Sequence, residues 1–428
     1  MTPINLMRAD WDRRAHEDPY YYVAFAQRGQ SVGEFLATAA ENIGAFESQL
    51  CRLPPRSAEP VRALEVGCGP GRLLLPMSTH FDEIHGVDIS PQMVQLARDT
   101  LKNVSHAHVH LTEHSDLRMF GSDHFDFVYS YAVFQHIPAK EIVLNYVCEI
   151  RRVLKPGGIT CCHFRGSPPL ASEHHEPATW TGCFFVLEDV KKLVIQNELQ
   201  LVNISGLDTQ YMMVTMRRPM PKGNGAVCSP GLLAVTWAAG TGQRVPRRGR
   251  TAAISLWMSD LPADASLLDF EIQCGGYIGW PYFISSPSES NGYQINARLP
   301  QGLAGEKVAV GVTFRDAAIG KRFEIELTDP VDSFPTIAAI ADAVDVGSRR
   351  IQGDSLKVWI ENVVDPLTAL FIVDGQPAQS FEFDFVDPIL SEYEFCVRFA
   401  HLPTGERSLS GSIDGVKLAP LTFAVDRS

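Results

Sequence analysis

The sequence predicts an α/β domain with a largely parallel sheet, followed by two all-β domains. Up to about residue 220, apolar runs alternate with amphipathic helical patterns, which is typical of strand–helix–strand units. The proline- and glycine-containing segment Arg218–Pro230 is a predicted linker. Beyond it helical patterns nearly vanish, and short β-branched and aromatic runs recur between Pro, Gly, Asp and Ser. The predicted units are an α/β domain at 1–220, a linker at 221–231, and β-sandwiches at 232–330 and 331–428.

The elements of the first domain follow from the spacing of its apolar residues. Five apolar runs are predicted strands: Arg62–Cys68, Glu83–Asp88, His108–Glu113, Phe125–Tyr131 and Gly157–Phe164. Apolar residues three and four apart predict helices at Ser90–Leu101, Lys140–Leu154 and Leu187–Leu199. A hairpin of Gln200–Ile204 and Tyr211–Arg217 follows the last helix. Continuous apolar strands between helices indicate a sheet that is covered on both faces.

One helix is predicted ahead of the first strand. Ser31 and Glu34 have the spacing of a capping box, which marks a helix start. The apolar residues that follow share one helical face: Phe35, Leu36, Ala39, Ile43, Phe46 and Leu50.

The β-rich half repeats itself at an offset of about 100 residues. The segment Tyr293–Arg298 (YQINAR) matches Tyr393–Arg398 (YEFCVR), and Gly305–Lys307 matches Gly405–Arg407. Strands at this spacing, present twice, indicate two β-sandwiches. The predicted strands are Ala252–Met258, Leu267–Gln273, Gln294–Leu299, Lys307–Phe314, Lys357–Glu361, Phe381–Phe385 and Tyr393–Phe399.

The composition indicates a globular chain and opposes some classes of partner. Of the 428 residues, 45% are hydrophobic and 20% charged, and the net charge of −13 disfavours binding to bulk nucleic acid. No apolar run approaches the roughly 18 residues of a membrane span, so none is expected. Nine cysteines without a repeating frame are typical of reduced thiols, which favours a cytoplasmic location.

The strongest chemical signal is the segment Leu64–Gly71 (LEVGCGPG), where an apolar strand ends. Open α/β sheets bind ligands at such strand ends, and glycines let the backbone turn sharply close to a ligand. The dinucleotide pattern GxGxxG does not fit, because Arg72 stands where its last glycine belongs. A Walker loop does not fit either, because no Lys-Ser/Thr pair follows the glycines.

This segment resembles the ExGxGxG signature of class I S-adenosylmethionine-dependent methyltransferases. Glu65, Gly67, Gly69 and Gly71 all match it. Further matches follow in the family's order: Gly86–Asp88, Glu113–Leu117, Phe125–Ser130, Gln135–Ile137 and Leu154–Gly158. The N-terminal segments Trp11–Arg14 and Asp18–Tyr22 look like the cap that precedes many such domains. The resemblance covers about residues 8–218, half of the chain.

The resemblance implies a Rossmann-like sheet of seven strands in the order 3-2-1-4-5-7-6, with the last strand antiparallel. It implies S-adenosyl-L-methionine as cofactor and S-adenosyl-L-homocysteine as product. In the family, the glycines Gly67–Gly71 cradle the amino acid moiety, the carboxylate at Asp88 holds the ribose, and the loop at Glu113 and His114 contacts adenine. A carboxylate suits two hydroxyls because it offers two acceptor oxygens. Further residues expected at the cofactor are Tyr22, Glu65, Cys68, Arg72, Ile89, Met93, Ser130 and Tyr131.

His136 is the candidate catalytic residue. It lies just beyond the fourth strand, where an imidazole could remove a proton from an acceptor hydroxyl. The alternative is a packing role at the edge of the cofactor pocket. No metal site is expected, because adjacent residues such as His174–Glu176 rarely bind one ion together, and a solvated loop is predicted there.

Other candidate residues also have a structural alternative. Asp88 could cap the helix that begins at Ser90. Glu113 and His114 could form an ordinary surface loop, and the tyrosines of Tyr20–Tyr22 could pack in the core of the cap. Both interpretations of each residue remain open at the level of sequence.

The sequence favours an oxygen acceptor. The segment Ser130–Val133 lacks the Asn/Asp-Pro-Pro-Tyr motif that accompanies N-methylation of bases or glutamine. The predicted reaction is therefore O-methylation of a sugar, glycan or small metabolite. The alternative is a scaffold or targeting protein that binds the cofactor without turnover.

The β-rich half resembles immunoglobulin-like repeats of bacterial multi-domain proteins. The resemblance implies delivery of the enzyme to a polymeric acceptor, or assembly into a homo-oligomer. Five aromatic residues could form a sugar-stacking platform or pack in the core: Trp257, Tyr277, Trp280, Tyr282 and Phe283.

Overall fold

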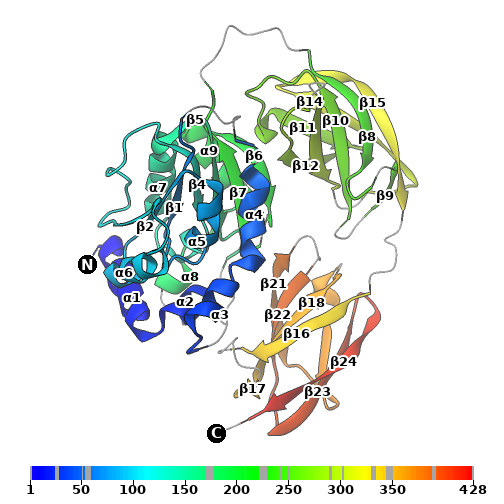
Figure 1. Cartoon of the computed structure of the whole chain (residues 1–428). Helices are drawn as coiled ribbons and strands as arrows, with labels where there is room; N and C mark the ends of the chain where they lie inside the picture. Colours follow the sequence, from blue (N-terminus) through cyan, green and yellow to red (C-terminus); the bar gives the residue numbers. More distant parts are fainter. Residues whose placement is uncertain are drawn as a thin grey trace.

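The computed structural model shows an α/β unit followed by two β-rich units (Figure 1). It describes residues 2–24, 28–50, 52–53, 59–168, 178–207, 209–220, 229–240, 242–247, 251–288, 292–300, 303–328, 334–343, 350–363, 365–387 and 392–426. Most of the predicted linker at 221–231 lies outside these residues, as does His174–Glu176. The predicted domain boundaries therefore remain predictions.

Seven strands form the centre of the α/β unit (Figure 1). They are β1 (Arg62–Val66), β2 (Glu83–Asp88), β3 (Ala107–Leu111), β4 (Phe125–Ser130), β5 (Leu154–Phe164), β6 (Gln200–Ser205) and β7 (Met212–Arg217). Their order is β3-β2-β1-β4-β5-β7-β6, as the resemblance implies. The first five run parallel, whereas β7 pairs antiparallel with both β5 and β6.

Helices cover both faces of this sheet. They include α4 (Ala40–Leu50), α5 (Leu74–Met77), α6 (Pro91–Thr100), α7 (Lys140–Val153) and α9 (Leu187–Gln196). Successive strand residues point to opposite faces, so Ala63 and Phe127 pack with α4, α5 and α6 while Leu64 and Val128 pack with α7 and α9. All four side chains are fully buried. Of the described helices, none is both long and apolar enough to cross a bilayer.

The helix predicted over residues 35–50 is divided in two in the structure. The first part, α3 (Val32–Ala37), begins with the predicted capping box: Ser31 Oγ accepts from Glu34 N, and Glu34 Oε2 accepts from Ser31 N. The chain then turns at Thr38 before α4. Arg72 Nη1 donates to the Thr38 carbonyl oxygen at 3.2 Å, which takes that carbonyl out of the helix. This tertiary contact overrides the local periodicity.

Of the two N-terminal helices, the first packs at the start of α6. They are α1 (Pro3–Glu17) and α2 (Pro19–Ala24), and the short α8 (Ala178–Thr181) lies against α1. Asp12 Oδ1 accepts from Ser90 Oγ at 2.7 Å and from Gln92 N at 3.1 Å. A carboxylate at a helix N-terminus is favourable because free backbone N–H groups point at it. Asp12 thereby holds α1 against the sheet's ligand-binding edge.

The β-rich units contain two sandwiches, each of two sheets. The first sandwich has β8 (Gly231–Trp237), β9 (Arg244–Pro246), β10 (Ala253–Ser259), β11 (Phe270–Cys274), β12 (Tyr277–Ile284), β13 (Gly292–Arg298), β14 (Lys307–Phe314) and β15 (Ala317–Thr328). The second has β16 (Thr336–Asp342), β17 (Arg350–Ile351), β18 (Ser355–Glu361), β19 (Leu370–Val373), β20 (Gln376–Pro377), β21 (Ser380–Asp387), β22 (Glu392–Arg398), β23 (Gly405–Ile413) and β24 (Val416–Val425).

The two sandwiches have the same strand order. One sheet of the first is β8-β10-β13-β12, and its counterpart in the second is β16-β18-β22-β21. The other sheets are β12-β11-β14-β15-β9 and β20-β19-β23-β24-β17, and each ends in a parallel pair. Tyr293 opposite Met258 and Tyr393 opposite Ile360 occupy equivalent places, as the sequence repeat predicts.

The sandwiches meet the α/β unit differently. The first continues the apolar core of that unit, and Phe283 of β12 pairs with Asn203 of β6. Ser266 Oγ also accepts from Leu201 N at 3.0 Å. The second has a core of its own and meets the α/β unit through polar groups, including Ser167 Oγ, which donates to Asp384 Oδ2 at 2.8 Å.

The five candidate platform aromatics of the first sandwich lie in different environments. Trp280 and Tyr282 pack partly buried against the core, as the packing interpretation expects. Phe283 lies under the Arg52 guanidinium at 4.9 Å. Trp257 and Tyr277 are exposed.

Candidate functional site

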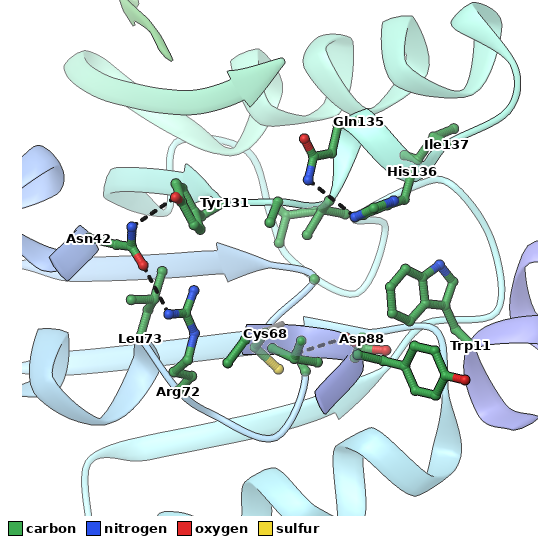
Figure 2. A pocket seen from close by; sticks show the side chains of 18 of the residues that line it. Trp11, Asn42, Cys68, Arg72, Leu73, Asp88, Tyr131, Gln135, His136 and Ile137 are labelled. Carbon is green, nitrogen blue, oxygen red and sulfur yellow. Dashed lines mark hydrogen bonds between the residues drawn. The ribbon is translucent and has the colours of Figure 1, made fainter. Parts of the chain in front are cut away.

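A pocket of about 750 Å³ lies at the carboxyl ends of β1, β2 and β4 (Figure 2). Small-molecule sites in proteins have volumes of about 300–1,000 Å³. The strand order reverses between β1 and β4, so the pocket lies at the topological switch point where open sheets bind ligands. Residues of α1, α2, α8, the strand-end loops and the second sandwich line it.

The loop after β1 forms the floor of the pocket through its glycines. Gly67, Gly69 and Gly71 have φ of 74°, 50° and 88°, a left-handed conformation that favours glycine. A Cβ at Gly67 would lie 2.3 Å from Val133 Cγ2, so only glycine lets the loop after β4 approach this closely. Gly67 and Gly69 line the pocket, whereas Gly71 turns toward α6, with Ala97 Cα 3.6 Å from where its Cβ would be. At Gly67 and Gly69 the floor is therefore formed by backbone.

Asp88, the last residue of β2, presents a carboxylate to the pocket (Figure 2). Its Oδ2 accepts from Gly69 N and its Oδ1 from Ser90 N, both at 2.9 Å. Burial raises the pKa of Asp88, and these backbone N–H donors oppose that shift. Each oxygen retains acceptor capacity for a ligand hydroxyl. The cap of α6 is Ser90, whose Oγ accepts from Met93 N at 3.2 Å, so Asp88 is not the cap.

Glu65 lies on β1 at the base of the pocket and is 3% exposed. Tyr129 Oη donates to Glu65 Oε2 at 3.0 Å. Burial raises the pKa of Glu65 to about 8, so the carboxyl is mostly protonated at neutral pH. A cationic group bound beside it would favour the ionised form and release the proton.

A second polar cluster joins Arg72, Asn42 and Tyr131 (Figure 2). Arg72 Nη1 donates to Asn42 Oδ1 at 2.9 Å, and Asn42 Nδ2 donates to Tyr131 Oη at 2.8 Å. All three residues line the pocket, and Arg72 is 6% exposed. The cluster fixes the Tyr131 ring, because its hydroxyl is held from α4.

His136 lines the pocket beyond β4 (Figure 2). Its Nδ1 donates to the Trp180 carbonyl oxygen at 2.6 Å, which places the hydrogen on Nδ1, and Gln135 Nε2 lies 3.2 Å from its Nε2. Burial lowers the pKa of His136 to about 3, so the ring is neutral. A neutral ring can accept a proton, but this pKa makes it a weak base. Its catalytic role remains a prediction.

The loop after β4 is strained at the pocket. Ala132 has φ of 55°, which is uncommon for a residue with a Cβ and concentrates at functional sites. Its N–H donates to His163 Nδ1 at 3.1 Å, and His163 Nε2 donates to the Gln210 carbonyl oxygen at 2.9 Å. Burial lowers the pKa of His163 to about 4. The neutral ring of His163 thus joins two pocket-lining loops.

The cap helices cover one side of the pocket with aromatic rings. Trp11, Tyr22 and Trp180 line it. The Arg14 guanidinium lies between them, 5.3, 5.2 and 4.5 Å from their respective ring centroids. Asp10 Oδ2 accepts from Arg14 Nε at 3.0 Å and from Thr179 Oγ1 at 2.6 Å, which links α1 to α8.

The structure gathers most of the predicted site residues in this one pocket. Those that line it are Tyr22, Glu65, Gly67, Cys68, Gly69, Arg72, Asp88, Ile89, Met93, Tyr131 and His136. Four predicted residues are outside the lining: Gly71, Glu113, His114 and Ser130. Glu113 and His114 are exposed, and buried Thr112 lines the pocket in their place. Ser130 Oγ instead donates to the Val66 carbonyl oxygen at 2.9 Å, which ties β4 to β1.

Two groups of lining residues were missed by the sequence reasoning. Asn42 contacts the predicted residue Tyr131, and Gln135 contacts the predicted residue His136. These amide contacts depend on tertiary geometry, which the sequence does not show. Lys357, Trp359 and Glu394 come from the second sandwich. Their alternation in a strand indicates only an outward sheet face, so no local signal marks them as part of a site.

Comparisons with known proteins identify the region around this pocket. A family model described as a methyltransferase domain matches residues 64–162. A ubiquinone biosynthesis O-methyltransferase of Cereibacter sphaeroides is 29% identical over 108 residues, covering 25% of this chain and 42% of that protein. A cyclopropane-fatty-acyl-phospholipid synthase of Escherichia coli is 32% identical over 108 residues, covering 25% and 27%. The chain thus spans less than half the length of these curated relatives.

A solved structure is also similar in part. The magnesium protoporphyrin IX methyltransferase of Synechocystis, with bound S-adenosylhomocysteine, is 14% identical, with 51% of this chain and 100% of that chain covered and a TM-score of 0.38. The family match spans β1 to β5 and contains Glu65, the glycine turn, Asp88 and His136. Residues 64–162 therefore form a class I S-adenosylmethionine-dependent methyltransferase domain.

Proposed function

We propose that the whole chain transfers a methyl group from S-adenosylmethionine to an oxygen of a sugar, glycan or small metabolite. The observation that carries this proposal is the extent of the pocket. It is lined by the glycine turn, Asp88 and His136, and also by Lys357 and Trp359 of a different unit. A pocket that only stored the cofactor would need no second end of this kind.

The residues of the first end fit the cofactor. Gly67 and Gly69 line the pocket with backbone, and Asp88 retains acceptor capacity for ribose hydroxyls. Glu65 can ionise opposite a cationic amino group. When bound, the cofactor supplies an activated methyl group on its sulfonium. The chain's own task is then to orient the acceptor and exclude water, which the rings of Trp11, Tyr22 and Trp180 support.

His136 is the candidate among the lining residues for accepting the hydroxyl proton. Because the hydrogen is on Nδ1, Nε2 is the atom that could accept the proton. The Gln135 amide lies against Nε2 and must move away before an acceptor hydroxyl can reach it. Because its pKa is about 3, we expect His136→Ala to lower kcat by about tenfold, less than the 10²–10⁴-fold of a well-matched base. Gln135→Ala is the matched control. Unchanged turnover in His136→Ala would remove His136 from the catalytic residues.

We also infer that the two sandwiches are immunoglobulin-like. If β9 is set apart, the first sandwich places its first, second, fifth and fourth strands in one sheet and its third, sixth and seventh in the other. Immunoglobulin constant domains divide their strands in this way.

Calorimetry and product release together test the proposed function. The full chain should bind S-adenosylhomocysteine, and Asp88→Ala should weaken that binding. With labelled S-adenosylmethionine and a panel of hydroxylated small molecules, the enzyme should release S-adenosylhomocysteine. Binding without release for every acceptor, cell extract included, would favour the cofactor-binding scaffold, and no binding would contradict both.

A further inference from the structure

The far end of the pocket is built by the second sandwich. Ala343, Lys357, Trp359 and Glu394 line it there. Lys357 and Trp359 lie on β18 and Glu394 on β22, and Ala343 follows β16 directly. These strands belong to one sheet, and Figure 1 shows the second sandwich beside the α/β unit. One sheet face therefore completes a pocket whose other walls lie more than 100 residues earlier in the chain.

The face that meets the pocket is the outward face of that sheet. Leu356, Val358 and Ile360 are fully buried in the sandwich core, so the alternating Lys357 and Trp359 point to the opposite side. Trp359 is opposite Glu394 on the neighbouring strand, and Glu394 is opposite Asp384 on the next. An aromatic ring and two carboxylates thus form one row across the face.

The charged groups in this row and beside it are buried. Lys357 Nζ and Glu394 Oε1 are 2.7 Å apart, with side chains 12% and 6% exposed. Asp384 is also buried and accepts from Ser167 Oγ of the α/β unit. Burying a charged pair carries a desolvation cost that its mutual attraction offsets only in part. Charges placed here consequently need a reason beyond stability.

The first sandwich shows what the same positions look like without a pocket. Trp257 opposite Gln294 is equivalent to Trp359 opposite Glu394, since Tyr293 and Tyr393 fix the register. The neighbouring polar contact is neutral there, with Gln294 Nε2 donating to Ser255 Oγ at 3.1 Å. Trp257 is 41% exposed and is outside the pocket lining. The repeated backbone therefore does not require an ion pair at this place.

The α/β unit faces this row with aromatic and polar groups of its own. Tyr131, Tyr211, Gln210 and Arg165 line the same pocket. Tyr211 is 43% exposed. Partial desolvation in the pocket raises the pKa of Tyr211, with Tyr131 and the carboxylates of Glu394 and Asp384 adding to the shift, so the tyrosine lies near both acids. Two domains thus supply rings and hydrogen-bonding groups to one space.

We propose that this space is the acceptor subsite, and that it takes a neutral hydroxylated ligand of the sugar class, stacked on Trp359 and hydrogen-bonded to Glu394 and Lys357. The inference rests on the proposed methyl transfer and adds the place and class of the acceptor. Trp359 would pack its face against the C–H groups of a sugar ring, Glu394 would accept from hydroxyls, and Lys357 would donate to them.

A neutral ligand fits the balance of charge. Lys357 is paired with Glu394, and buried Asp384, which lies beside Glu394 outside the lining, offsets the charge of Arg165, so these four groups carry no net charge. A site for an anion or a cation would present an unbalanced partner. The cofactor end contains a different set, with Glu65, Arg72 and Asp88.

Ligand binding to the full chain loaded with S-adenosylhomocysteine tests this inference. The probe is a panel of neutral mono- and disaccharides, detected by saturation-transfer NMR and titrated by calorimetry. At least one sugar should bind, and Trp359→Ala should weaken it by roughly tenfold or more, as for buried tryptophan anchors in other sites. Affinity for S-adenosylhomocysteine should change by less than about twofold, because Trp359 is at the other end.

Three further variants serve as controls and as a test of the ion pair. Trp257→Ala removes the same residue type from the equivalent strand of the first sandwich and should leave sugar binding unchanged. The double variant Lys357→Ser with Glu394→Gln installs the neutral pair of the first sandwich and should lose sugar affinity while remaining folded. Trp359→Phe keeps a ring and should retain part of the binding if Trp359→Ala disturbs folding.

The possible outcomes distinguish a failure of the proposed function from a failure of the acceptor-subsite inference. A wild-type chain that does not bind S-adenosylhomocysteine contradicts the proposed function itself. A chain that binds S-adenosylhomocysteine but no sugar of the panel overturns this inference and leaves the proposed function standing. Equal losses in Trp359→Ala and Trp257→Ala would also overturn it, because the effect would then come from the sandwich fold.

Discussion

The two sandwiches share a strand order but join the α/β unit in opposite ways. The first pairs β12 with β6 and merges Leu267 and Ile284 into the same apolar core as Leu201. The second has a separate core around Phe395 and meets the α/β unit with polar side chains such as Asp384. The same fold therefore provides structural support in one place and a pocket wall in the other. The second sandwich forms the pocket wall with the outward face of one sheet, whereas the first joins the α/β unit through β12 and the core around Leu267.

The chemistry of the two junctions predicts different strengths. Apolar burial stabilises roughly in proportion to area, at about 25 cal/mol per Å². A buried polar junction largely offsets its own desolvation. We therefore expect the first junction to be permanent and the second to separate more easily, which would give an acceptor a way into the pocket.

The largest expected effect comes from removing the sandwiches one at a time. A chain of residues 1–330 should fold and bind S-adenosylhomocysteine, because the second core is separate. A chain of residues 1–220 should aggregate, because Leu199, Leu201 and Ile204 would lose the apolar partners that the first sandwich provides. Size-exclusion chromatography and calorimetry measure both results. A well-behaved 1–220 fragment with native affinity would refute the shared core.

Core truncations test the same difference without deleting a unit. Leu201→Ala and Phe395→Ala each remove a fully buried side chain and should cost about 2–5 kcal/mol. In calorimetric melts of the full chain, Leu201→Ala should lower a transition that contains the α/β unit and the first sandwich, and Phe395→Ala a different one. If both variants shift one single transition equally, the second sandwich is not an independent unit.

Sequence reasoning succeeded where the determining contacts are local. The strands and helices of the α/β unit follow apolar periodicity, and the glycine turn and Asp88 follow short motifs at the ends of two successive strands, so both could be placed in advance. The repeat around Tyr293 and Tyr393 likewise needed only a fixed offset.

Sequence reasoning could not predict the features that depend on contacts between distant parts of the chain. The turn at Thr38 arises from a hydrogen bond with Arg72, and periodicity alone predicted one continuous helix. The loop after β3 was identified correctly, but which residue faces the pocket depends on how it folds, and Thr112 lines it while Glu113 is exposed. Trp359 is part of the pocket only because a repeat nearly 200 residues after the methyltransferase motifs packs back onto them.

Asp88→Ala sharpens the comparison by separating the cofactor end from the acceptor end. We expect its affinity for S-adenosylhomocysteine to fall by about 100-fold, since about 3 kcal/mol is typical of two lost hydrogen bonds to a charged group. Sugar binding to the second sandwich should change much less. Isothermal titration of both ligands into both proteins gives the result. Native cofactor affinity in Asp88→Ala would contradict its assignment to the ribose.

A smaller effect is the pH dependence that Glu65 gives to the α/β unit. Its pKa of about 8 exceeds the ordinary 4.5, so the folded state binds a proton that the unfolded state releases, and the stabilisation is lost as pH rises toward 8. Between pH 6.5 and 8 this amounts to about 2 kcal/mol, at about 1.4 kcal/mol per pH unit. His136 and His163, with pKa values of about 3 and 4, are neutral in the folded state over this pH range. In the unfolded state their ordinary pKa of 6.5 lies at the lower limit of the range, so they add little to the pH dependence.

Glu65→Gln isolates this contribution, because the amide keeps the shape of the protonated carboxyl but cannot ionise. Urea unfolding of both proteins at several values between pH 6.5 and 8 measures it. The wild type should lose stability with rising pH in the transition of the α/β unit and first sandwich, and Glu65→Gln should lose markedly less. A slope that is the same in both proteins would mean that Glu65 is ionised at neutral pH. The buried carboxyl would then be paired already, and a cationic cofactor would gain less from it.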